Sequence, residues 1–584
     1  MTFEQDAELK ATIRKIALIN AARHHGKAQT GPVIGKLLGE KPELRTNAKE
    51  IASLVSEVVQ EVNILSLNKQ KRIVEERWPE ALIKEKIEEE KRLPPLPNAD
   101  EYAQVITRFS PNPDCVLHLG SARAIVLCYE YAHSYKGKFI LRFEDTDPKL
   151  KRPVLKFYDR IREDLAWLGC KPDREYIQSD RILMYYEYAE KLLKNGNAYV
   201  CTCQPKQFRE KVLDNKPCEC SDLPLEEQLK RWHRMLEGGY KEGEAVVRIK
   251  TDLNHPNPAV REWPALRVIN SEKHPHPRVG SKYHVWPLYN FACGIDDHLM
   301  GVTHIIRGKE HLTNMVRQEF MYRYLGWRYP EAIHYGRLKI TGASLSKSKI
   351  VQGIREGLYK DWDDPRLATF AALRRRGITP EAIKKLIVDV GPKTSDVVLS
   401  WENLYAYNRK MLDPEADRYF FVHNPIQLTV KDVPKTFTAK LRLHPDHSER
   451  GFRKYTITPK GEDNFVSLWI SRNDTDALKV GKVIRLMELF NIKFEKVNTF
   501  SAEASFISEA YNDARRAGAS LIHWIPIGVD IPCEVVMPDA TIAEGIAESA
   551  CKGLKANDLI QFERFGFVRI DEINSKLTAY YSHR

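Results

Sequence analysis

The sequence has no long apolar run, few cysteines and no evident internal repeat. None of its apolar stretches reaches the roughly 20 residues that a membrane-spanning helix needs, so no membrane partner is expected. Residues 1–6 lack the basic and apolar regions of a signal peptide. Ten cysteines in 584 residues do not suggest a disulfide scaffold, which favours a reducing, cytoplasmic location.

Size and charge indicate a multidomain protein with an anionic partner. At about 150 residues for each domain, 584 residues correspond to about four domains. Hydrophobic residues make up 43% and charged residues 29%, as in ordinary globular proteins. The formal net charge of +12 favours a polyanion such as RNA, although charge alone does not identify it.

Residues 1–97 are expected to form a helical extension and a linker. Apolar residues recur at helical spacing between Leu9 and Ile19 and again between Ala48 and Val62. The charged stretch 83–92 predicts a further helix with a solvated face, which the proline-rich residues 93–97 then interrupt. This extension could dock a protein partner, which the sequence does not identify, or could have a plain packing role.

A strand–helix–strand pattern begins near residue 104. Apolar runs at 104–107 and 138–143 flank a helical stretch from Ser121, which predicts an α/β domain with a parallel sheet and right-handed crossovers. Ligands in such domains bind beyond the carboxyl ends of the strands. The segment Arg142-Phe143-Glu144-Asp145-Thr146-Asp147-Pro148 completes the second strand and follows it directly, where site residues are expected.

The rest of the chain divides by pattern. Around residues 199–280 a strand-like run and loops rich in proline and histidine interrupt the α/β pattern, residues 366–390 are expected to be helical, and short strands with intervening glycines and prolines predict one or two β-barrels near the C-terminus. The expected domains after the extension are 98–198 and 283–350 as two halves of the α/β domain, 199–282 as an inserted module, 351–417 as a helical connection, and 418–584 as the barrels.

Two short segments carry the candidate chemistry. In His118-Leu119-Gly120-Ser121, free N–H groups at a helix N-terminus could bind phosphate, and glycine would let a nucleotide approach the backbone. In Ser344-Leu345-Ser346-Lys347-Ser348-Lys349, a lysine offers a mobile cation for phosphates. Taken alone, the first segment is more often an ordinary helix-capping turn and the second a solvated loop.

Together and in this order, the two segments resemble the ATP-binding motifs of class I aminoacyl-tRNA synthetases. Four segments between or near them narrow the resemblance to the glutamyl/glutaminyl subgroup, and the two ends of the chain resemble its archaeal glutamyl branch. The four segments are Arg108-Phe109-Ser110-Pro111-Asn112-Pro113, residues 142–148, residues 286–291 and residues 303–311. The resemblance implies a Rossmann-like class I synthetase catalytic domain with an N-terminal helical domain, an inserted module that binds the acceptor stem, and C-terminal anticodon-binding β-barrels.

The resemblance also implies roles for individual residues. His118 and Lys347 would be catalytic, and Arg108 would pair with the substrate carboxylate while Glu144 holds the α-ammonium group. Ser121 and Ser344 stand where the family usually has a histidine and a lysine, so their roles are open. ATP would be bound by His118, Gly120, Ser121, Ser346, Lys347 and Ser348, and the amino acid by Arg108, Ser110, Glu144, Tyr289 and Arg307.

The residue types in this set favour a dicarboxylic amino acid. Two arginines and a tyrosine suit glutamate, whereas a neutral glutamine would leave one buried charge uncompensated, at a cost of several kcal/mol. Structural ion pairing is the alternative for Arg307 and for Arg142.

Four cysteines form a candidate metal site. Cys201, Cys203, Cys218 and Cys220 form two close pairs, as expected for tetrahedral thiolate ligation of a structural Zn²⁺ ion. Each pair encloses one residue rather than the commoner two. Four free thiols, or an iron–sulfur site, are the alternatives.

The C-terminal region is expected to read the anticodon, since sequence-specific RNA recognition uses basic side chains and aromatic stacking on unpaired bases. The candidates are Arg418, Lys440, Arg442, Arg450, Arg453 and Lys454 for charge, and Tyr419, Tyr455 and Trp524 for stacking. Taken singly, each is more often a surface charge or a core aromatic.

The implied function is ATP-dependent activation of L-glutamate, with Mg²⁺ on the phosphates, and transfer of the glutamyl group to tRNA(Glu), with tRNA(Gln) as a further candidate. The resemblance implies that the adenylate forms only with tRNA bound. A glutamine-specific synthetase is the nearest alternative. A synthetase-like RNA-binding protein without activity is the other, and Ser121 and Ser344 motivate it.

Overall fold

The computed structural model describes residues 3–23, 26–41, 44, 48–78, 92–343, 345–474 and 479–584. The chain divides into two compact units, residues 1–90 and residues 91–584, which are treated separately. Most of the charged helix expected at 83–92 lies outside the described residues. No described helix is long and apolar enough to cross a membrane.

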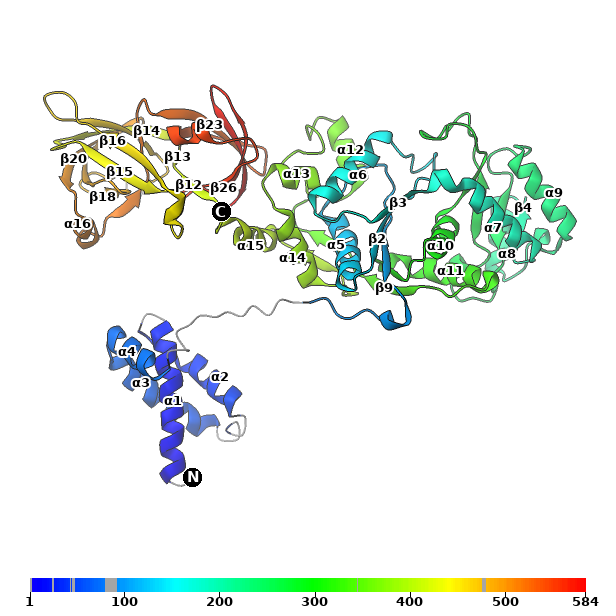
Figure 1. Cartoon of the computed structure of the whole chain (residues 1–584), viewed down its shortest axis with the longest axis horizontal. Coiled ribbons are helices and arrows are strands. Elements are labelled where there is room, and N and C mark those ends of the chain that lie inside the picture. Colours follow the sequence, from blue (N-terminus) through cyan, green and yellow to red (C-terminus); the bar gives the residue numbers. More distant parts are fainter. Residues whose placement is uncertain are drawn as a thin grey trace. The chain divides into compact units, whose positions relative to one another are not determined.

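The first unit is helical, as its periodicity predicts. Its helices are α1 (Phe3–Arg23), α2 (Thr30–Glu40), α3 (Ala48–Ile64) and α4 (Leu67–Arg77) (Figure 1). Their apolar residues meet in a core of their own, in which Ile13, Val33 and Val55 are fully buried. The unit therefore buries a core without help from the rest of the chain.

The second unit begins with a parallel sheet. Strands β1 (Ile106–Phe109), β2 (Lys138–Phe143) and β3 (Arg174–Ile177) are parallel in that order, and β8 (His304–Gly308) pairs in parallel with β9 (Glu331–Tyr335). Strand β8 lies beside β1, because Thr303 and Ile106 exchange hydrogen bonds of 2.9 Å. Helices α5 (Leu119–Ser134) and α6 (Leu155–Trp167) connect the first strands, and α5 lies beside β2 in Figure 1. The predicted α/β sheet is confirmed.

An antiparallel sheet interrupts this domain. Strands β4 (Ala198–Cys201), β5 (Val246–Ile249), β6 (Pro264–Val268) and β7 (Val285–Pro287) are adjacent in that order, so the inserted sheet includes the strand that leads back to the α/β domain. Its helices are α7 (Ile182–Lys194), α8 (Pro205–Leu213) and α9 (Leu225–Leu236), with α10 (Tyr289–Leu299) and α11 (Leu312–Leu325) following β7 and β8.

The proline-rich segment before β1 is packed rather than free. Leu96 is buried in the core of the α/β domain, its backbone N–H donates to the Tyr135 hydroxyl at 2.9 Å, and the Pro97 carbonyl lies 2.9 Å from a ring nitrogen of His304. This segment anchors the start of the second unit.

A mixed segment leads to the C-terminal strands. It contains β10 (Leu338–Ile340), α12 (Lys347–Arg355), α13 (Phe370–Arg375), α14 (Pro380–Val390), β11 (Val397–Leu399) and α15 (Trp401–Leu412). The single helix expected over 366–390 is two helices, because Gly377 adopts φ +77° and Thr379 caps a new helix that begins with Pro380.

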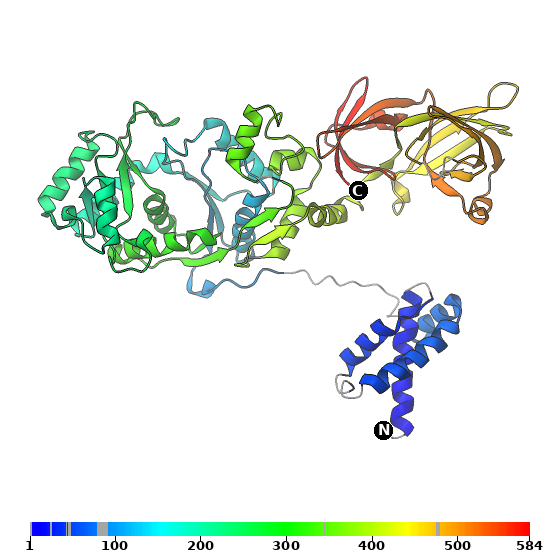
Figure 2. The same cartoon turned by 180° about the vertical axis from the view of Figure 1, so that it is seen from behind.

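Two seven-stranded sheets form the C-terminal region, and each surrounds its own apolar core, as the prediction of β-barrels requires (Figures 1 and 2). One has the order β12-β25-β26-β27-β23-β24-β13, with bounds Asp417–Tyr419, Leu559–Phe562, Gly566–Ile573, Leu577–His583, Asp530–Val536, Ile542–Glu548 and Phe421–His423. The other has the order β21-β18-β19-β20-β14-β17-β22, with bounds Ser520–Ile522, Val483–Leu486, Asn491–Val497, Ser501–Ser508, Pro425–Lys431, Val466–Ser471 and Ile525–Pro526. A hairpin of β15 (Phe437–Arg442) and β16 (Phe452–Ile457) and the short helix α16 (Tyr511–Arg516) complete the region.

Candidate active site

The turn at the start of α5 is held by the segment 368–370. The Leu119 N–H donates to Ala368 O at 2.9 Å, and the Phe370 N–H donates to Leu117 O at 3.0 Å. His118 precedes the helix in an extended conformation, and burial lowers the pKa of its imidazole, which is therefore neutral at pH 7. The turn thus presents a neutral imidazole at a helix N-terminus.

Glycine is needed at position 120 because the His118 ring lies over it. A Cβ atom on Gly120 would lie 2.8 Å from Cε1 of that ring, closer than real Cβ contacts allow. The same position would lie 3.4 Å from Cδ1 of Leu345. Residues 345–349, which we call the lysine loop, therefore lie directly beside the α5 turn.

An ion pair also joins the two predicted nucleotide segments. Nζ of Lys347 lies 2.5 Å from Oδ2 of Asp114, in the loop between β1 and α5. The hydroxyl oxygens of Ser346 and Ser348 are 3.1 Å apart at the start of α12. Ser344 lies outside the described residues. The fold brings the two segments together, which is the geometry that one shared nucleotide would require.

A cluster of buried charges lies where β1, β2 and β8 meet α10; we call Arg108, Arg142, Glu144, Tyr289, Cys293, Asp297 and Arg307 the arginine cluster. Asp297 on α10 accepts from Nε of Arg108 at 3.0 Å and from Nη1 of Arg142 at 2.7 Å. Nη2 of Arg142 in turn donates to Glu144 at 2.9 Å. Burial opposes ionisation of Asp297, but the two guanidinium groups hold its pKa well below the usual range.

These contacts leave only part of the Arg108 guanidinium group available to a substrate. Its Nε and Nη2 atoms both face Asp297, at 3.0 and 3.3 Å, so only the edge that includes Nη1 could pair with a carboxylate. Arg142, for which structural ion pairing was an alternative, is fully buried and paired with Asp297 and Glu144. It acts here as an internal structural cation.

Arg307 differs from both, because no described carboxylate lies within ion-pair distance of it. Its guanidinium donates to Gln318 Oε1 at 3.2 Å and to the Tyr329 hydroxyl at 3.0 Å, and its buried Nε has no hydrogen-bond partner among the described residues. A buried cation with only neutral partners pays a desolvation cost that a bound anion would relieve.

Burial keeps the titratable side chains around Arg307 neutral. Burial lowers the pKa of His311 and of His334 to about 4, and the positive charge of Arg307 acts in the same direction. Both imidazoles are therefore neutral at pH 7. The hydroxyl of Tyr289, whose ring centroid lies 5.3 Å from that of His311, has its pKa raised by burial and stays protonated.

Unpaired polar atoms also point to a ligand at this place. The Ser110 Oγ and Asn290 Oδ1 atoms are buried without a hydrogen-bond partner among the described residues. Buried polar atoms are normally satisfied, so two orphans beside a cluster of charges are consistent with a missing polar ligand.

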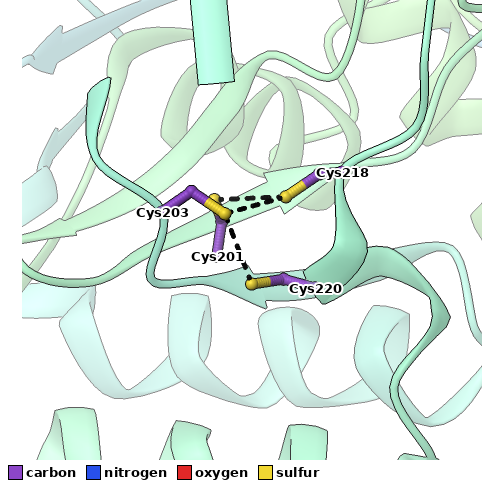
Figure 3. Close-up of side chains that lie close together, drawn as sticks. All are labelled: Cys201, Cys203, Cys218 and Cys220. Atoms are coloured by element: carbon purple, nitrogen blue, oxygen red, sulfur yellow. Dashed lines mark hydrogen bonds between the residues drawn. The ribbon is translucent and has the colours of Figure 1, made fainter. Parts of the chain in front are cut away.

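The four cysteine side chains converge, as Figure 3 shows. Their sulfur atoms lie within 4.8 Å of one another, and the Sγ–Sγ distance from Cys218 is 3.4 Å to Cys203 and 3.7 Å to Cys201. Tetrahedral zinc with Zn–S bonds of about 2.3 Å separates its sulfurs by about 3.8 Å. Cys201 ends β4 and Cys203 follows it, while Cys218 and Cys220 lie at the turn after α8, so two segments meet at the cluster. The donor set and spacing fit a closed Zn²⁺ site.

The C-terminal candidates divide into buried and exposed groups. The prediction that Tyr419, Tyr455 and Trp524 offer stacking faces is wrong, since all three rings are buried among the strands. Arg453 is buried as well, where it pairs with Glu548 and Glu563. Four basic candidates remain exposed: Lys440, Arg442, Arg450 and Lys454.

Three of the exposed side chains share one face of the β15–β16 hairpin. Lys440 lies opposite Lys454, and Arg442 lies opposite Phe452, whose ring is 46% exposed. A cavity of about 500 Å³ opens beside this hairpin, between the two C-terminal sheets; its lining includes Lys440, Arg442, Met487, Gln561 and Arg564. The face combines cations with an exposed ring, which suits a polyanion with flat bases.

Some site residues were not found from the sequence. Asp114 follows the predicted segment 108–113 directly, and Asn290 follows Tyr289, so both were within reach. Asp297 lies two helical turns after Tyr289 on α10, and the i, i+4, i+8 spacing with Cys293 between them was the available signal.

The second unit combines a parallel sheet, two facing loops at a helix N-terminus, a buried cluster of arginines and two C-terminal β-domains. This combination is typical of a multidomain α/β enzyme that handles a nucleotide and a polyanion. The family models for tRNA synthetases class I (E and Q) match it: the catalytic-domain model over residues 104–414, and two anticodon-binding-domain models over 416–508 and 521–571.

Known proteins match nearly the whole chain. The glutamate–tRNA ligase of Pyrococcus abyssi is 54% identical over 99% of this chain and 100% of the relative, and that of Methanocaldococcus jannaschii is 47% identical over the same shares. The chain belongs to the class I aminoacyl-tRNA synthetases of the glutamyl and glutaminyl (E and Q) family. A solved glutamate tRNA ligase from Elizabethkingia meningosepticum matches at 26% identity over 53% of this chain and 71% of that chain, with a TM-score of 0.38 that is too low to support structural comparison.

Proposed function

We propose that the chain is a glutamate–tRNA ligase, which converts ATP, L-glutamate and tRNA(Glu) into AMP, pyrophosphate and glutamyl-tRNA. The names of the relatives support this substrate. Within the molecule, the observation that carries the proposal is Arg307, a buried cation without a described carboxylate partner.

Charge balance favours glutamate over glutamine. The arginine cluster contains three guanidinium groups, and Asp297 and Glu144 supply two carboxylates, which leaves one positive charge. Glutamate has a net charge of −1 at pH 7 and would neutralise the cluster, with its side-chain carboxylate on Arg307. Glutamine has no net charge and would leave the excess cation buried, at a cost of several kcal/mol.

The nucleotide would lie between the α5 turn and the lysine loop. A glutamate carboxylate oxygen attacks the α-phosphorus of ATP, the bond to the β-phosphate oxygen breaks, and pyrophosphate leaves with the bonding electrons. His118 and the N–H groups near Gly120 and Ser121 would contact the phosphates and ribose, while Lys347, with Ser346 and Ser348, would stabilise the departing pyrophosphate. Mg²⁺ would add positive charge on the phosphates, and we assign it no protein ligand.

In the second step, a ribose hydroxyl at the 3′ end of tRNA attacks the acyl carbon of the adenylate. The bond between acyl carbon and phosphate oxygen breaks, AMP leaves with the bonding electrons, and the proton of the ribose hydroxyl passes to the phosphate of AMP or to water. Asp114 holds Lys347 in the free protein. A bound nucleotide would draw this lysine away from Asp114, and the family resemblance implies that the adenylate forms only with tRNA bound.

The four cysteines would hold a structural Zn²⁺ ion. Four thiolates on Zn²⁺ carry a net charge of −2, and Nη1 of Arg231, 3.4 Å from Sγ of Cys220, would offset part of it. Because two segments of residues 199–282 meet there, the ion would hold the shape of the module that receives the acceptor stem.

The anticodon would bind the exposed β15–β16 face and the neighbouring cavity, which combine Lys440, Arg442 and Lys454 with room for an unstacked base. Whether tRNA(Gln) is also charged would depend on which anticodon base these side chains bind. We place the reaction in the cytoplasm. We also propose that the functional domains after the helical extension are residues 98–198, 199–282, 283–350, 351–417 and 418–584.

Pyrophosphate exchange tests the proposal. With tRNA(Glu) present, we expect exchange with glutamate and at least about 100-fold less with glutamine. Arg307→Gln should lower kcat/KM for glutamate at least about 100-fold, because it removes the partner of the side-chain carboxylate. A preference for glutamine would instead support the glutaminyl alternative, and the absence of exchange with either amino acid would support the inactive RNA-binding alternative.

A further inference from the structure

Asp297 is a buried carboxylate that cannot itself reach a substrate. It is on α10, its side chain is about 1% exposed, and both of its oxygens are engaged by arginines. Oδ1 accepts from Arg108 and Arg142 together, and Oδ2 accepts from Arg108 at 3.3 Å. Whatever it contributes to function must act through these two side chains.

The two arginines lead in different directions. Arg108 lies on β1 with its free edge toward the cluster, while Arg142 extends from β2 and fixes Glu144 at 2.9 Å. In the proposed function Arg108 pairs with a carboxylate and Glu144 holds the ammonium group. One carboxylate therefore sets the position of two groups that contact opposite charges of an amino acid.

We infer that Asp297 is the positioning residue that sets the spacing between the carboxylate and ammonium contacts for the amino acid. This inference rests on the proposed function. Because long arginine side chains have many rotamers, a shared anchor removes most of their freedom before the substrate binds, which lowers the entropic cost of binding. Asp297 also supplies the negative charge that leaves the cluster with a single positive excess.

Cys293 supports the same geometry from one helical turn earlier. Its sulfur lies 3.2 Å from Nη2 of Arg142 and 3.5 Å from Oδ2 of Asp297. Burial raises the pKa of the thiol to about 12, so it remains protonated and adds no charge. It closes the space around Arg142 without competing with Asp297 for the cation.

The neighbouring residue provides a matched control. Asp296 is also fully buried on α10, and it accepts from Gln178 at 3.0 Å, Arg181 at 2.8 Å and Tyr185 at 2.6 Å. None of these three donors belongs to the arginine cluster. Asp296→Asn should therefore cost stability, as Asp297→Asn does, without disturbing the amino acid contacts.

The test measures pyrophosphate exchange by the full chain with tRNA(Glu), and determines KM separately for glutamate and for ATP. We expect Asp297→Asn to raise KM for glutamate at least about tenfold with KM for ATP within about twofold, whereas Asp296→Asn lowers the melting temperature but leaves both KM values within about twofold. Equal effects of the two variants on KM for glutamate, or an unchanged KM in Asp297→Asn, would overturn the inference.

A second variant covers the case in which Asp297→Asn does not fold. In Arg142→Lys the two separate nitrogens that contact Asp297 and Glu144 are replaced by one on a shorter side chain, so KM for glutamate should again rise at least about tenfold. An unchanged KM in that variant would overturn the inference. If the unaltered protein itself shows no exchange with glutamate, the proposed function fails and the inference falls with it; normal exchange by the unaltered protein assigns any failure to the inference alone.

Discussion

At the scale of single residues, the site consists of charges whose positions are set by burial. Arg108 and Arg142 share one carboxylate, whereas Arg307 is surrounded by neutral partners. This difference predicts different roles: Arg142 would hold the cluster together, Arg108 would keep one edge for a substrate, and Arg307 would attract an anion. Lys347 is different again, because its ion pair with Asp114 is partly exposed and can exchange one anion for another.

Lys347→Ala should reduce pyrophosphate exchange at least about 100-fold, because it removes a cation from the departing pyrophosphate. The free energy of unfolding should change by about 1 kcal/mol or less, since a partly exposed ion pair contributes little. Exchange kinetics and urea denaturation measure the two effects. Lys349→Ala, an exposed lysine of the same helix, is the matched control and should stay within about twofold of the unaltered protein. Normal exchange by Lys347→Ala would show that the loop is not catalytic.

At the scale of elements, the β4–β7 sheet packs into a large apolar core, whereas the segments that carry the four thiols have a small cluster of their own. The cluster around Cys201 and Cys218 includes only a few apolar neighbours, among them Phe208 and Val212. A metal ion would stabilise these loops more than their own packing does, because it fixes four chain positions at once.

Metal analysis of the purified protein should find about one zinc ion for each chain, and Cys218→Ser should reduce that content to near zero. The variant should also lose charging activity more than thermal stability, because the module is proposed to receive the acceptor stem and the other apolar cores do not include these cysteines. Cys170→Ser, a buried thiol of the α/β core, is the control and should keep its zinc. Zinc content near zero in the unaltered, folded protein would contradict the assignment.

At the scale of the whole molecule, two features bear on RNA binding: the positive net charge and the division of the chain into two units. The net charge of +12 is spread over a chain whose two units each have a core of their own. Long-range attraction of this kind guides a polyanion and is screened by salt, whereas buried contacts such as those of Arg307 are screened little.

Raising KCl from about 50 to about 200 mM should therefore raise KM for tRNA at least about tenfold, because bound cations of the RNA are released on binding. KM for glutamate should change by about twofold or less over the same range, since the arginine cluster is desolvated. Aminoacylation assays at several salt concentrations, with the melting temperature as control, measure both. Equal salt dependence of the two KM values would argue against a separate electrostatic surface for tRNA.

Local patterns predicted several elements to within a residue or two. The apolar run at 138–143 is strand β2 with the same bounds. Gly120 was expected to give a nucleotide room, and in the structure the His118 ring already lies over it. The prediction failed at Gly377, where a left-handed residue and the following Thr379-Pro380 pair divide one periodic stretch into two helices. It failed again at Trp524, because an aromatic residue in a strand can face the core or the solvent, and a single sequence does not tell which.

The sequence by itself indicated the order of the helical, α/β and β-rich parts and the two close pairs of cysteines, because periodicity and ligand spacing are local properties. The two nucleotide segments are weak signals alone, and their interpretation came from the family resemblance. Tertiary structure alone decided which charges meet. Arg108, Arg142 and Asp297 come from two strands and a helix far apart in the chain, and only their common burial makes one carboxylate the partner of two arginines. Arg307 depends on folding in the same way, because burial removes it from water and the fold gives it no described carboxylate partner.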